Sequence, residues 1–292
     1  MDLLYAIAEW RTPLGERIWQ GLTFFGEETF IMVALCILFW CVNKNLSYKI
    51  GATFFLGGLL TQGLKITFRI PRPWVLDPTF KPVGSAIETA TSFSFPSGHT
   101  ASAGSLFFPA ALSARRPWAR ALLVAMPFVV GFSRLYLGVH TLLDVGCALA
   151  ITAVFAGIVH TVSTTRLWEK PGAVALGLLV FSGAVLIYAF CRNDVTRDML
   201  EDCIKAAAAG VGFAVGYYIE KKWIGFSPKA VWWVQAIKVL VGIGGVLAIK
   251  SGVKALLGEA LAVDALRYFL LILWVIALWP LIFRNFIRKP QE

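Results

Sequence analysis

Residues 93–112 read FSFPSGHTASAGSLFFPAAL and place a Pro-Ser-Gly-His turn directly before an apolar run. Ser97 can cap a helix that begins at Gly98, because a serine oxygen accepts hydrogen bonds from the free backbone N–H groups of a first helical turn. The run that follows is apolar enough for a lipid environment. The stretch therefore predicts a helix that begins at a polar surface, with His99 in its first turn.

The composition indicates that this helix lies in a membrane. Of the 292 residues, 58% are hydrophobic and 15% are charged, whereas soluble domains are roughly 45–50% apolar and about 25% charged. No charge occurs between Pro171 and Cys191, and a run near 20 residues is what a bilayer core of about 30 Å requires of a helix. The predicted fold class is an all-α polytopic membrane protein, with a helical-bundle core and additional C-terminal transmembrane helices.

Nine transmembrane spans are predicted from the gaps between charges. They are residues 29–43, 48–68, 99–114, 118–137, 141–164, 171–191, 203–220, 230–250 and 266–284. Residues 3–25 mix aromatic and charged side chains, which is typical of an amphipathic helix lying in the interface, with a tenth, poor span as the alternative. The chain is thus divided into an interfacial segment (1–28), a transmembrane core (29–165) and extra helices of unknown role (166–292).

The lysines and arginines predict the orientation. One set of loops carries Lys44, Lys49, Arg115, Arg116, Arg120, Arg166, Lys170, Lys221, Lys222, Lys229, Arg284, Arg288 and Lys289. By the positive-inside rule these loops are cytoplasmic, so the N-terminal stretch and the loops at 69–98, 138–140 and 192–202 share the outer face. The net charge of +10 then reflects topology, and no nucleic-acid partner is expected. The pattern favours a bacterial inner (plasma) membrane, with the outer face toward the periplasm or exterior.

Cations and a helix start gather on that outer face. Arginine offers a planar fork matched to phosphate oxygens, and lysine offers a point charge. The free N–H groups at the helix start attract anions, and a glycine there lets an anion approach closely. The set predicts a phosphate-binding site made of Lys65, Arg72, Ser97, Gly98 and Arg134.

Two histidines and an aspartate could supply the chemistry. His140 and Asp144 are four residues apart and share a helix face, so the carboxylate can fix the imidazole tautomer and leave the other nitrogen free as nucleophile or base. His99 is suited to donate a proton to a leaving group. Positioning and charge stabilisation suffice for phosphoryl transfer, so neither a metal nor a cofactor is expected.

The three segments resemble the type 2 phosphatidic acid phosphatase family, the membrane lipid phosphatases that share a core with vanadium haloperoxidases. The family pattern runs K-x-x-x-x-x-x-R-P, then P-S-G-H, then S-R-x-x-x-x-x-H-x-x-x-D. Its fixed positions are all present, as Lys65, Arg72, Pro73, Pro96, Ser97, Gly98, His99, Ser133, Arg134, His140 and Asp144. The resemblance covers residues 25–165. It implies that His140 forms a phosphohistidine, that Asp144 orients it and that His99 protonates the leaving oxygen.

The sequence therefore predicts an integral membrane lipid phosphatase that hydrolyses a lipid phosphomonoester or diphosphate at the outer face. Candidate substrates are undecaprenyl diphosphate, slightly favoured because the site faces outward, phosphatidic acid and phosphatidylglycerol phosphate. The expected partners are this lipid and the bilayer, and small residues at 206–216 and 242–245 leave a homodimer open. A lipid phosphotransferase, and a non-catalytic lipid transporter or binder, remain as alternatives.

Four residues outside this set also carry expectations. Cys191 and Cys203 flank one loop and could pair in an oxidising compartment. Lys238 lies within a predicted span and is expected to snorkel to the cytoplasmic face. His160 is 20 residues beyond His140 on one predicted helix, about 30 Å away, and is not expected to join the site.

Overall fold

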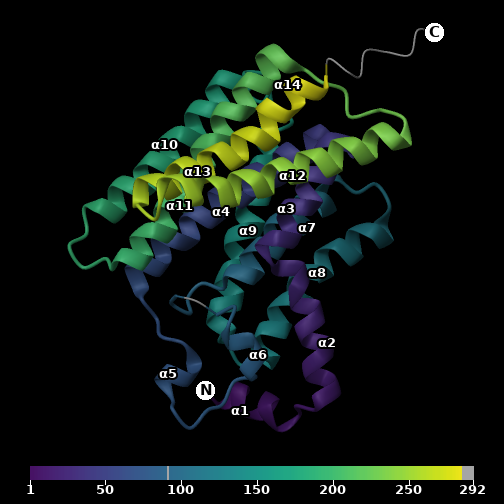
Figure 1. The fold of residues 1–292 in the computed structure, drawn as a ribbon. Coiled ribbons are helices and arrows are strands. Elements are labelled where there is room, and N and C mark those ends of the chain that lie inside the picture. The colour runs from purple at the N-terminus through teal and green to yellow at the C-terminus, as the bar shows by residue number, and fades with distance from the viewer. Residues whose placement is uncertain (91, 285–292) are drawn as a thin grey trace.

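The computed structural model describes residues 1–90 and 92–284, and every regular element in this part of the chain is helical (Figure 1). The long elements are α3 (Glu28–Ile37) with its π-helical continuation η2 (Leu38–Val42), α4 (Lys44–Phe68), α7 (Gly98–Ser113), α8 (Pro117–Tyr136), α9 (Leu142–Val162), α10 (Pro171–Phe190), α11 (Arg197–Ile219) with η3 (Glu220–Ile224), α12 (Trp232–Leu257), and α13 (Leu261–Leu273) with η4 (Trp274–Leu278) and α14 (Trp279–Phe283). The short ones are α1 (Asp2–Glu9), α2 (Pro13–Thr23), η1 (Phe24–Gly26), α5 (Pro73–Leu76) and α6 (Gly84–Ile87). The predicted all-α fold class is confirmed, and each of the nine predicted spans coincides with a helix.

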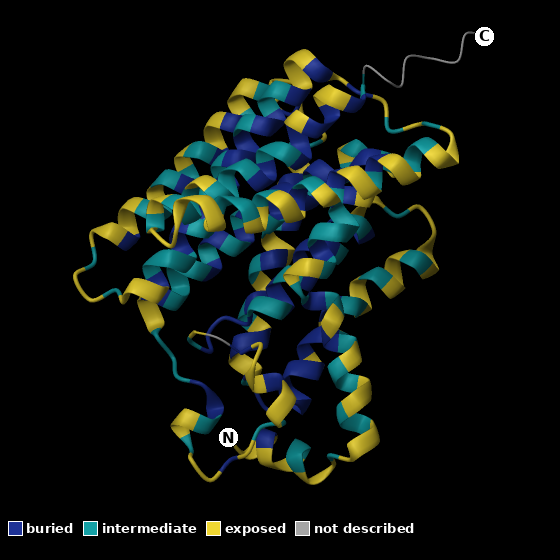
Figure 2. Cartoon of the chain, viewed as in Figure 1, coloured by how far each residue is buried: buried dark blue, intermediate teal, exposed yellow. Residues whose placement is uncertain are grey.

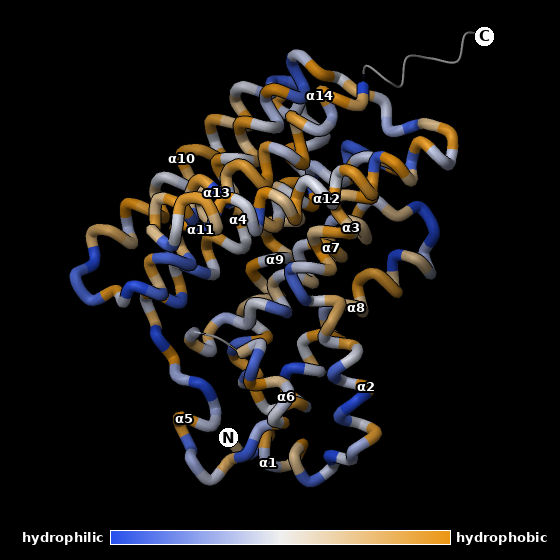
Figure 3. Tube along the Cα trace, in the orientation of Figure 1, coloured by the Kyte–Doolittle hydropathy of each residue, from blue (hydrophilic) through white to orange (hydrophobic). Residues whose placement is uncertain are grey.

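Within the described residues, five helical elements are long enough and apolar enough to cross a membrane. These are α8, α9, α10, α12 and the continuous segment Leu261–Phe283. A sixth is available if the pair Pro13–Gly26 and Glu28–Val42, bent by 51°, forms one broken span. Figure 3 shows hydrophobic residues along α10, α12 and α13, and hydrophilic ones at the α10–α11 loop. The protein is an integral membrane protein.

The N-terminal segment packs on the end of α8. Arg11 Nε donates to the carbonyl of Tyr136 at 2.8 Å, and the Thr12 N–H donates to the Tyr136 hydroxyl at 3.1 Å. Figure 1 shows α1, α2, α5 and α6 together at the lower end of the molecule. The location of the N-terminal segment in the membrane interface stays a prediction. Its hydrogen bonds to Tyr136 join it to α8, the helix that carries Arg134.

Local capping fixes where the two site helices begin. Ser97 is the N-cap of α7, as predicted, and its Oγ accepts from the Thr100 N–H at 3.5 Å and from the Thr100 hydroxyl at 2.9 Å. Thr141 and Asp144 form a capping box at the start of α9. Each cap satisfies backbone N–H groups that a helix end would otherwise leave without a partner.

The loops sort to two ends of the bundle. At one end, the Trp168 indole N–H donates to Asn45 Oδ1 at 3.0 Å, which joins the α9–α10 loop to the start of α4. At the other end, Arg69 forms an ion pair of 2.8 Å with Asp194 of the α10–α11 loop. Arg69 has a left-handed φ of 49°, which ends α4 and turns the chain toward the site. The loops thus group as predicted, and which end faces the cytoplasm stays a prediction.

The C-terminal helices share a hydrophobic core with α4. Gly51 of α4 lies so close to α11 that an added Cβ would come within 2.4 Å of the Phe213 ring. The largest buried cluster joins Trp40 of η2, Phe213 of α11 and Trp279 of α14. Figure 2 shows the buried residues along the centre of the bundle and exposed ones on the outer faces of α2 and α12. The N-terminal and C-terminal halves thus share one hydrophobic core.

Two charged side chains are buried near the end of the bundle that carries the α11–α12 loop. Glu220 is 0% exposed and pairs with both Lys44 and the Tyr48 hydroxyl. Lys238 is 1% exposed, and its ammonium donates to the carbonyls of Trp40 at 2.8 Å and Pro228 at 3.1 Å. The expected snorkelling is therefore wrong, because backbone carbonyls of η2 and the α11–α12 loop satisfy the ammonium inside the protein.

We expect Glu220→Gln to destabilise the protein strongly. Breaking a fully buried ion pair costs about 3–5 kcal/mol, and the cost here should be somewhat lower, because the Lys44 side chain is 19% exposed and keeps its hydrogen bond to the carbonyl of Phe226. Glu169→Gln, at an exposed position of the α9–α10 loop, is the matched control. Thermal unfolding in detergent measures the effect, and equal Tm values for the two variants would show that the Lys44–Glu220 pair contributes nothing.

The cysteines of the described chain are all free. Cys191 is exposed at the end of α10, whereas Cys203 is buried within α11. The pairing considered for these two residues is not formed in this structure.

Candidate active site

Four of the eight predicted site residues are joined by direct contacts. Arg72 lies in the segment after α4, Ser97 caps α7, and His140 and Asp144 flank the start of α9. The Ser97 N–H donates to the carbonyl of Asp144 at 3.1 Å, which ties the start of α7 to the start of α9. The exposed fractions of Arg72, His140 and Asp144 are 7%, 2% and 0%, so the group is withdrawn from solvent.

His140 lies between a guanidinium and a carboxylate. Its Nε2 is 2.9 Å from Arg72 Nη1, and its Nδ1 is 3.4 Å from Asp144 Oδ2. Because a guanidinium can only donate, Nε2 must present its lone pair, which assigns the proton to Nδ1 on the carboxylate side. The nitrogen with nucleophilic character therefore faces the cation that would bind phosphate.

Ser94 is a site residue that the sequence analysis missed. Its hydroxyl donates to Asp144 Oδ2 at 2.6 Å and lies 3.4 Å from His140 Nδ1, and the side chain is 0% exposed. The Thr141 N–H donates to the same carboxylate oxygen at 2.7 Å. These two donors hold the carboxylate that orients His140. The only sequence signal was a polar residue three positions before Ser97.

Among the described residues, two guanidinium nitrogens of Arg134 are available to a ligand. It is 0% exposed, and its Nη1 donates to Thr23 Oγ1 at 3.0 Å, whereas Nε and Nη2 have no hydrogen-bond partner among the described residues. His99 Nε2 likewise has none in the described part of the chain. Buried donors without partners cost free energy, so this arrangement suits a site that an anion completes. Thr23 was also missed by the sequence analysis.

Lys65 and Gly98 complete the predicted set. Lys65 is half-buried in the last turn of α4, close enough for the charges of Arg72 and Asp144 to act on its ammonium. The charges of Lys65, Arg72 and Arg134 in turn act on His99. At Gly98 an added Cβ would meet no atom within 4 Å, so open space lies in front of the helix start. His160 lies near the opposite end of α9, as expected.

Burial keeps His140 neutral. Its pKa is lowered from 6.5 to about 3, first because burial disfavours the charged ring, with the Asp144 hydrogen bond opposing this and Arg72 adding to it. An unfolded chain binds the proton below about 6.5, so the folded state loses stability as pH falls from there toward about 3, by up to about 1.4 kcal/mol per pH unit.

We therefore expect Tm to fall more steeply with acidification in the wild type than in His140→Asn. Thermal unfolding at several pH values between about 6.5 and about 4.5 measures the difference. His160→Asn, near the far end of α9 and remote from the site, should behave like the wild type. Parallel curves for the wild type and His140→Asn would contradict the assignment of a neutral buried imidazole.

The fold and this site define a helical integral membrane protein with a buried His–Asp pair facing several cations. Residues 46–168 match the PAP2 superfamily, and residues 204–290 match the transmembrane extension of PAP2 superfamily phosphatases. The chain belongs to the PAP2 superfamily, the type 2 phosphatidic acid phosphatases that the sequence motifs resemble. The helices after residue 166, to which the sequence analysis gave no role, therefore include a known extension of this superfamily.

Several relatives have similar sequences. Sphingosine-1-phosphate phosphatase 2 of Mus musculus is 27% identical over 207 residues, which is 66% of this chain and 56% of the relative. The Homo sapiens protein of that name is 27% identical over 214 residues, or 69% and 51%. A probable sphingosine-1-phosphate phosphatase of Dictyostelium discoideum is 31% identical over 174 residues, or 53% and 41%. The chain thus spans about half the length of the mammalian relatives it matches.

Two solved structures are similar to part of this chain. One is a PAP2-type phosphatidylglycerolphosphate phosphatase of Bacillus subtilis, with a TM-score of 0.48, 24% identity and coverage of 56% of this chain and 85% of that one. The other is LpxE of Aquifex aeolicus, with a TM-score of 0.46, 26% identity and coverage of 55% and 93%.

Proposed function

We propose that the protein is a membrane lipid phosphatase that hydrolyses a lipid phosphate through a covalent bond between phosphorus and His140 Nε2. The observation that carries this proposal is the position of His140, with Nδ1 toward Asp144 at 3.4 Å and Nε2 toward Arg72 at 2.9 Å. The membrane setting indicates a substrate whose tail stays in the bilayer while its phosphate reaches the site.

In the first step, the phosphate displaces Arg72 from the lone pair of His140. Arg72, the unpaired nitrogens of Arg134 and the ammonium of Lys65 would then bind the phosphate oxygens. Nε2 forms a bond to phosphorus as the P–O bond to the lipid breaks, and the leaving oxygen takes a proton from His99. The negative charge of the bound phosphate stabilises the imidazolium form of His99 before this transfer.

In the second step, water replaces the histidine. His99, now neutral, accepts a proton from the water as its oxygen attacks phosphorus and the N–P bond breaks. Inorganic phosphate leaves, and His140 regains its neutral form with the proton still on Nδ1. The Asp144 carboxylate stabilises the positive charge that His140 carries while it is phosphorylated, and Ser94 and Thr141 keep that carboxylate in place.

The substrate class is a phosphomonoester or diphosphate attached to a lipid. The names of the relatives add sphingosine 1-phosphate to the candidates that the sequence analysis named. Undecaprenyl diphosphate, phosphatidic acid and phosphatidylglycerol phosphate remain predictions, as do a bacterial inner membrane and a site on its outer face.

The test is release of inorganic phosphate by the purified protein from these four lipids, in detergent and with EDTA present. Release from at least one lipid in EDTA supports hydrolysis without a metal. A phosphorylated acceptor in place of free phosphate would instead indicate a phosphotransferase. Lipid movement across vesicles that survives His140→Ala, with no phosphate released by the wild type, would indicate a transporter.

A further inference from the structure

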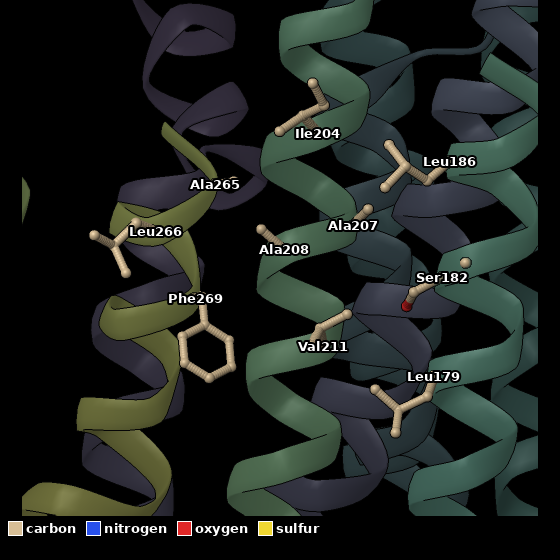
Figure 4. A pocket seen from close by; sticks show the side chains of 11 residues that line it. Leu179, Ser182, Leu186, Ile204, Ala207, Ala208, Val211, Ala265, Leu266 and Phe269 are labelled. Atoms are coloured by element: carbon tan, nitrogen blue, oxygen red, sulfur yellow. The ribbon is translucent and has the colours of Figure 1, made fainter. Parts of the chain in front are cut away.

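The C-terminal helices form an apolar groove apart from the His140 site. It has a volume of about 380 Å³ and is lined by residues of α10, α11 and α13 (Figure 4). Figure 4 shows Leu179, Ser182 and Leu186 pointing from α10 toward α11, with Phe269 on the α13 side. Small residues of α11, Ala207 and Ala208, provide its depth. The volume is at the lower end of the roughly 300–1,000 Å³ typical of small-molecule sites.

Water is a poor occupant for this groove. Ser182 supplies the single polar side chain of its lining, is 1% exposed and has no hydrogen-bond partner for Oγ among the described residues. An ordered water needs about two to four polar partners, and one hydroxyl cannot provide them. The occupant must therefore be apolar, or the groove would stay empty and its walls would lose dispersion contacts.

The groove also opens toward lipid. Leu266 at its rim is 42% exposed, and on α10 the neighbouring Val180 and Ile187 are 62% and 65% exposed. Both α10 and the α13 segment are among the candidate membrane spans, so these surfaces face hydrocarbon. A hydrocarbon chain is flexible and apolar, and the bilayer brings such chains against both helices along their length. A lipid chain is therefore the occupant that this lining fits.

We propose that this groove binds one hydrocarbon chain of a bilayer lipid, at a site separate from the phosphate site. The end of the groove nearest the α10–α11 loop lies at Leu186, which packs on a buried cluster containing Ile66 of α4. Phe93 packs on the same cluster and immediately precedes Ser94, so this cluster connects the groove to the segment that supports the candidate active site.

A pair of glycines on α10 gives a matched test. An added Cβ meets nothing within 4 Å at either Gly183 or Gly177, so both tolerate leucine, but only Gly183 lines the groove. The probe is phosphatidylglycerol with a mid-chain diazirine, diluted into vesicles of phosphatidylethanolamine and phosphatidylglycerol. After irradiation, lipid adducts are mapped by mass spectrometry of peptides.

We expect adducts to concentrate on the groove-lining residues Leu179, Leu186, Ile204 and Val211 and to fall about threefold or more in Gly183→Leu, because the leucine fills space that the chain would occupy and removes its packing contacts. Gly177→Leu should label like the wild type, and Ala208→Leu serves as a second groove-filling variant. Val180 and Ile187 lie on α10 outside the groove lining. If they were labelled as strongly as the groove residues, and neither groove-filling variant changed the labelling, the proposal would be overturned in favour of unspecific annular lipid. Disulfide-linked dimers of Gly183→Cys in vesicles would overturn it in favour of a second copy.

Discussion

His140→Ala should lower phosphate release by at least about 10⁴-fold, because removing a nucleophile leaves only binding and charge stabilisation to act on the substrate. The structure gives a specific reason. Nε2 of His140 is the imidazole nitrogen that meets Arg72, the cation proposed to bind phosphate, and Asp144 and Ser94 already orient the ring. The measurement is kcat/KM with whichever lipid phosphate proves to be the substrate.

His160→Ala is the matched control, because it removes the other imidazole of the same chain segment at the far end of α9. It should retain wild-type activity. Brief exposure of the wild type to substrate labelled at phosphorus should also yield an acid-labile phosphoprotein that His140→Ala does not form. Activity in His140→Ala within a few-fold of the wild type would exclude the covalent mechanism.

Arg134→Lys should lower kcat/KM by about 10²–10³-fold, the usual loss when one donor to a transition-state oxyanion is removed. Lysine keeps the charge but not the planar fork, so this variant separates charge from geometry. In the structure Arg134 Nη1 donates a hydrogen bond to Thr23 Oγ1, whereas Nε and Nη2 have no partner among the described residues. A lysine ammonium cannot reproduce both functions at once.

Arg120→Lys is the corresponding control, since Arg120 lies on the same helix, is exposed, and donates to the carbonyl of Ala114. It should leave kcat/KM unchanged. If Arg134→Lys behaved in the same way, Arg134 would act through its charge alone. Thr23→Val would then be the next variant, because it frees Nη1 without changing the cation.

Much of the candidate site could be predicted because it is local in sequence. The Ser97 cap follows from helix geometry and occurs as expected. His140 also contacts Asp144, but it precedes α9, which begins at Leu142, so the two residues do not share a helix face as expected; the capping box at Thr141 and Asp144 turns the carboxylate back toward His140. The three motifs could be placed at one end of the bundle because apolar spans of known length alternate between faces. The contacts of Arg72 with His140 confirm that placement.

The residues that sequence analysis missed act across long separations. Ser94 is 50 positions from Asp144, and Thr23 is 111 positions from Arg134. Neither has a spacing that a single helix or turn would explain, since their partners are set by how helices pack. The same applies to Lys238, whose carbonyl partners come from two other segments.

The close approach of α4 and α11 at Gly51 and Phe213 limits how this protein could be rearranged. A chimera that joined residues 1–165 to the C-terminal helices of another protein would need a ring, or a group of similar shape, over Gly51. A version ending at residue 165 would leave that side of α4 bare within the bilayer. Any exchange between proteins must therefore move α4 and α11 together, because the two helices pack on each other although they are far apart in the gene.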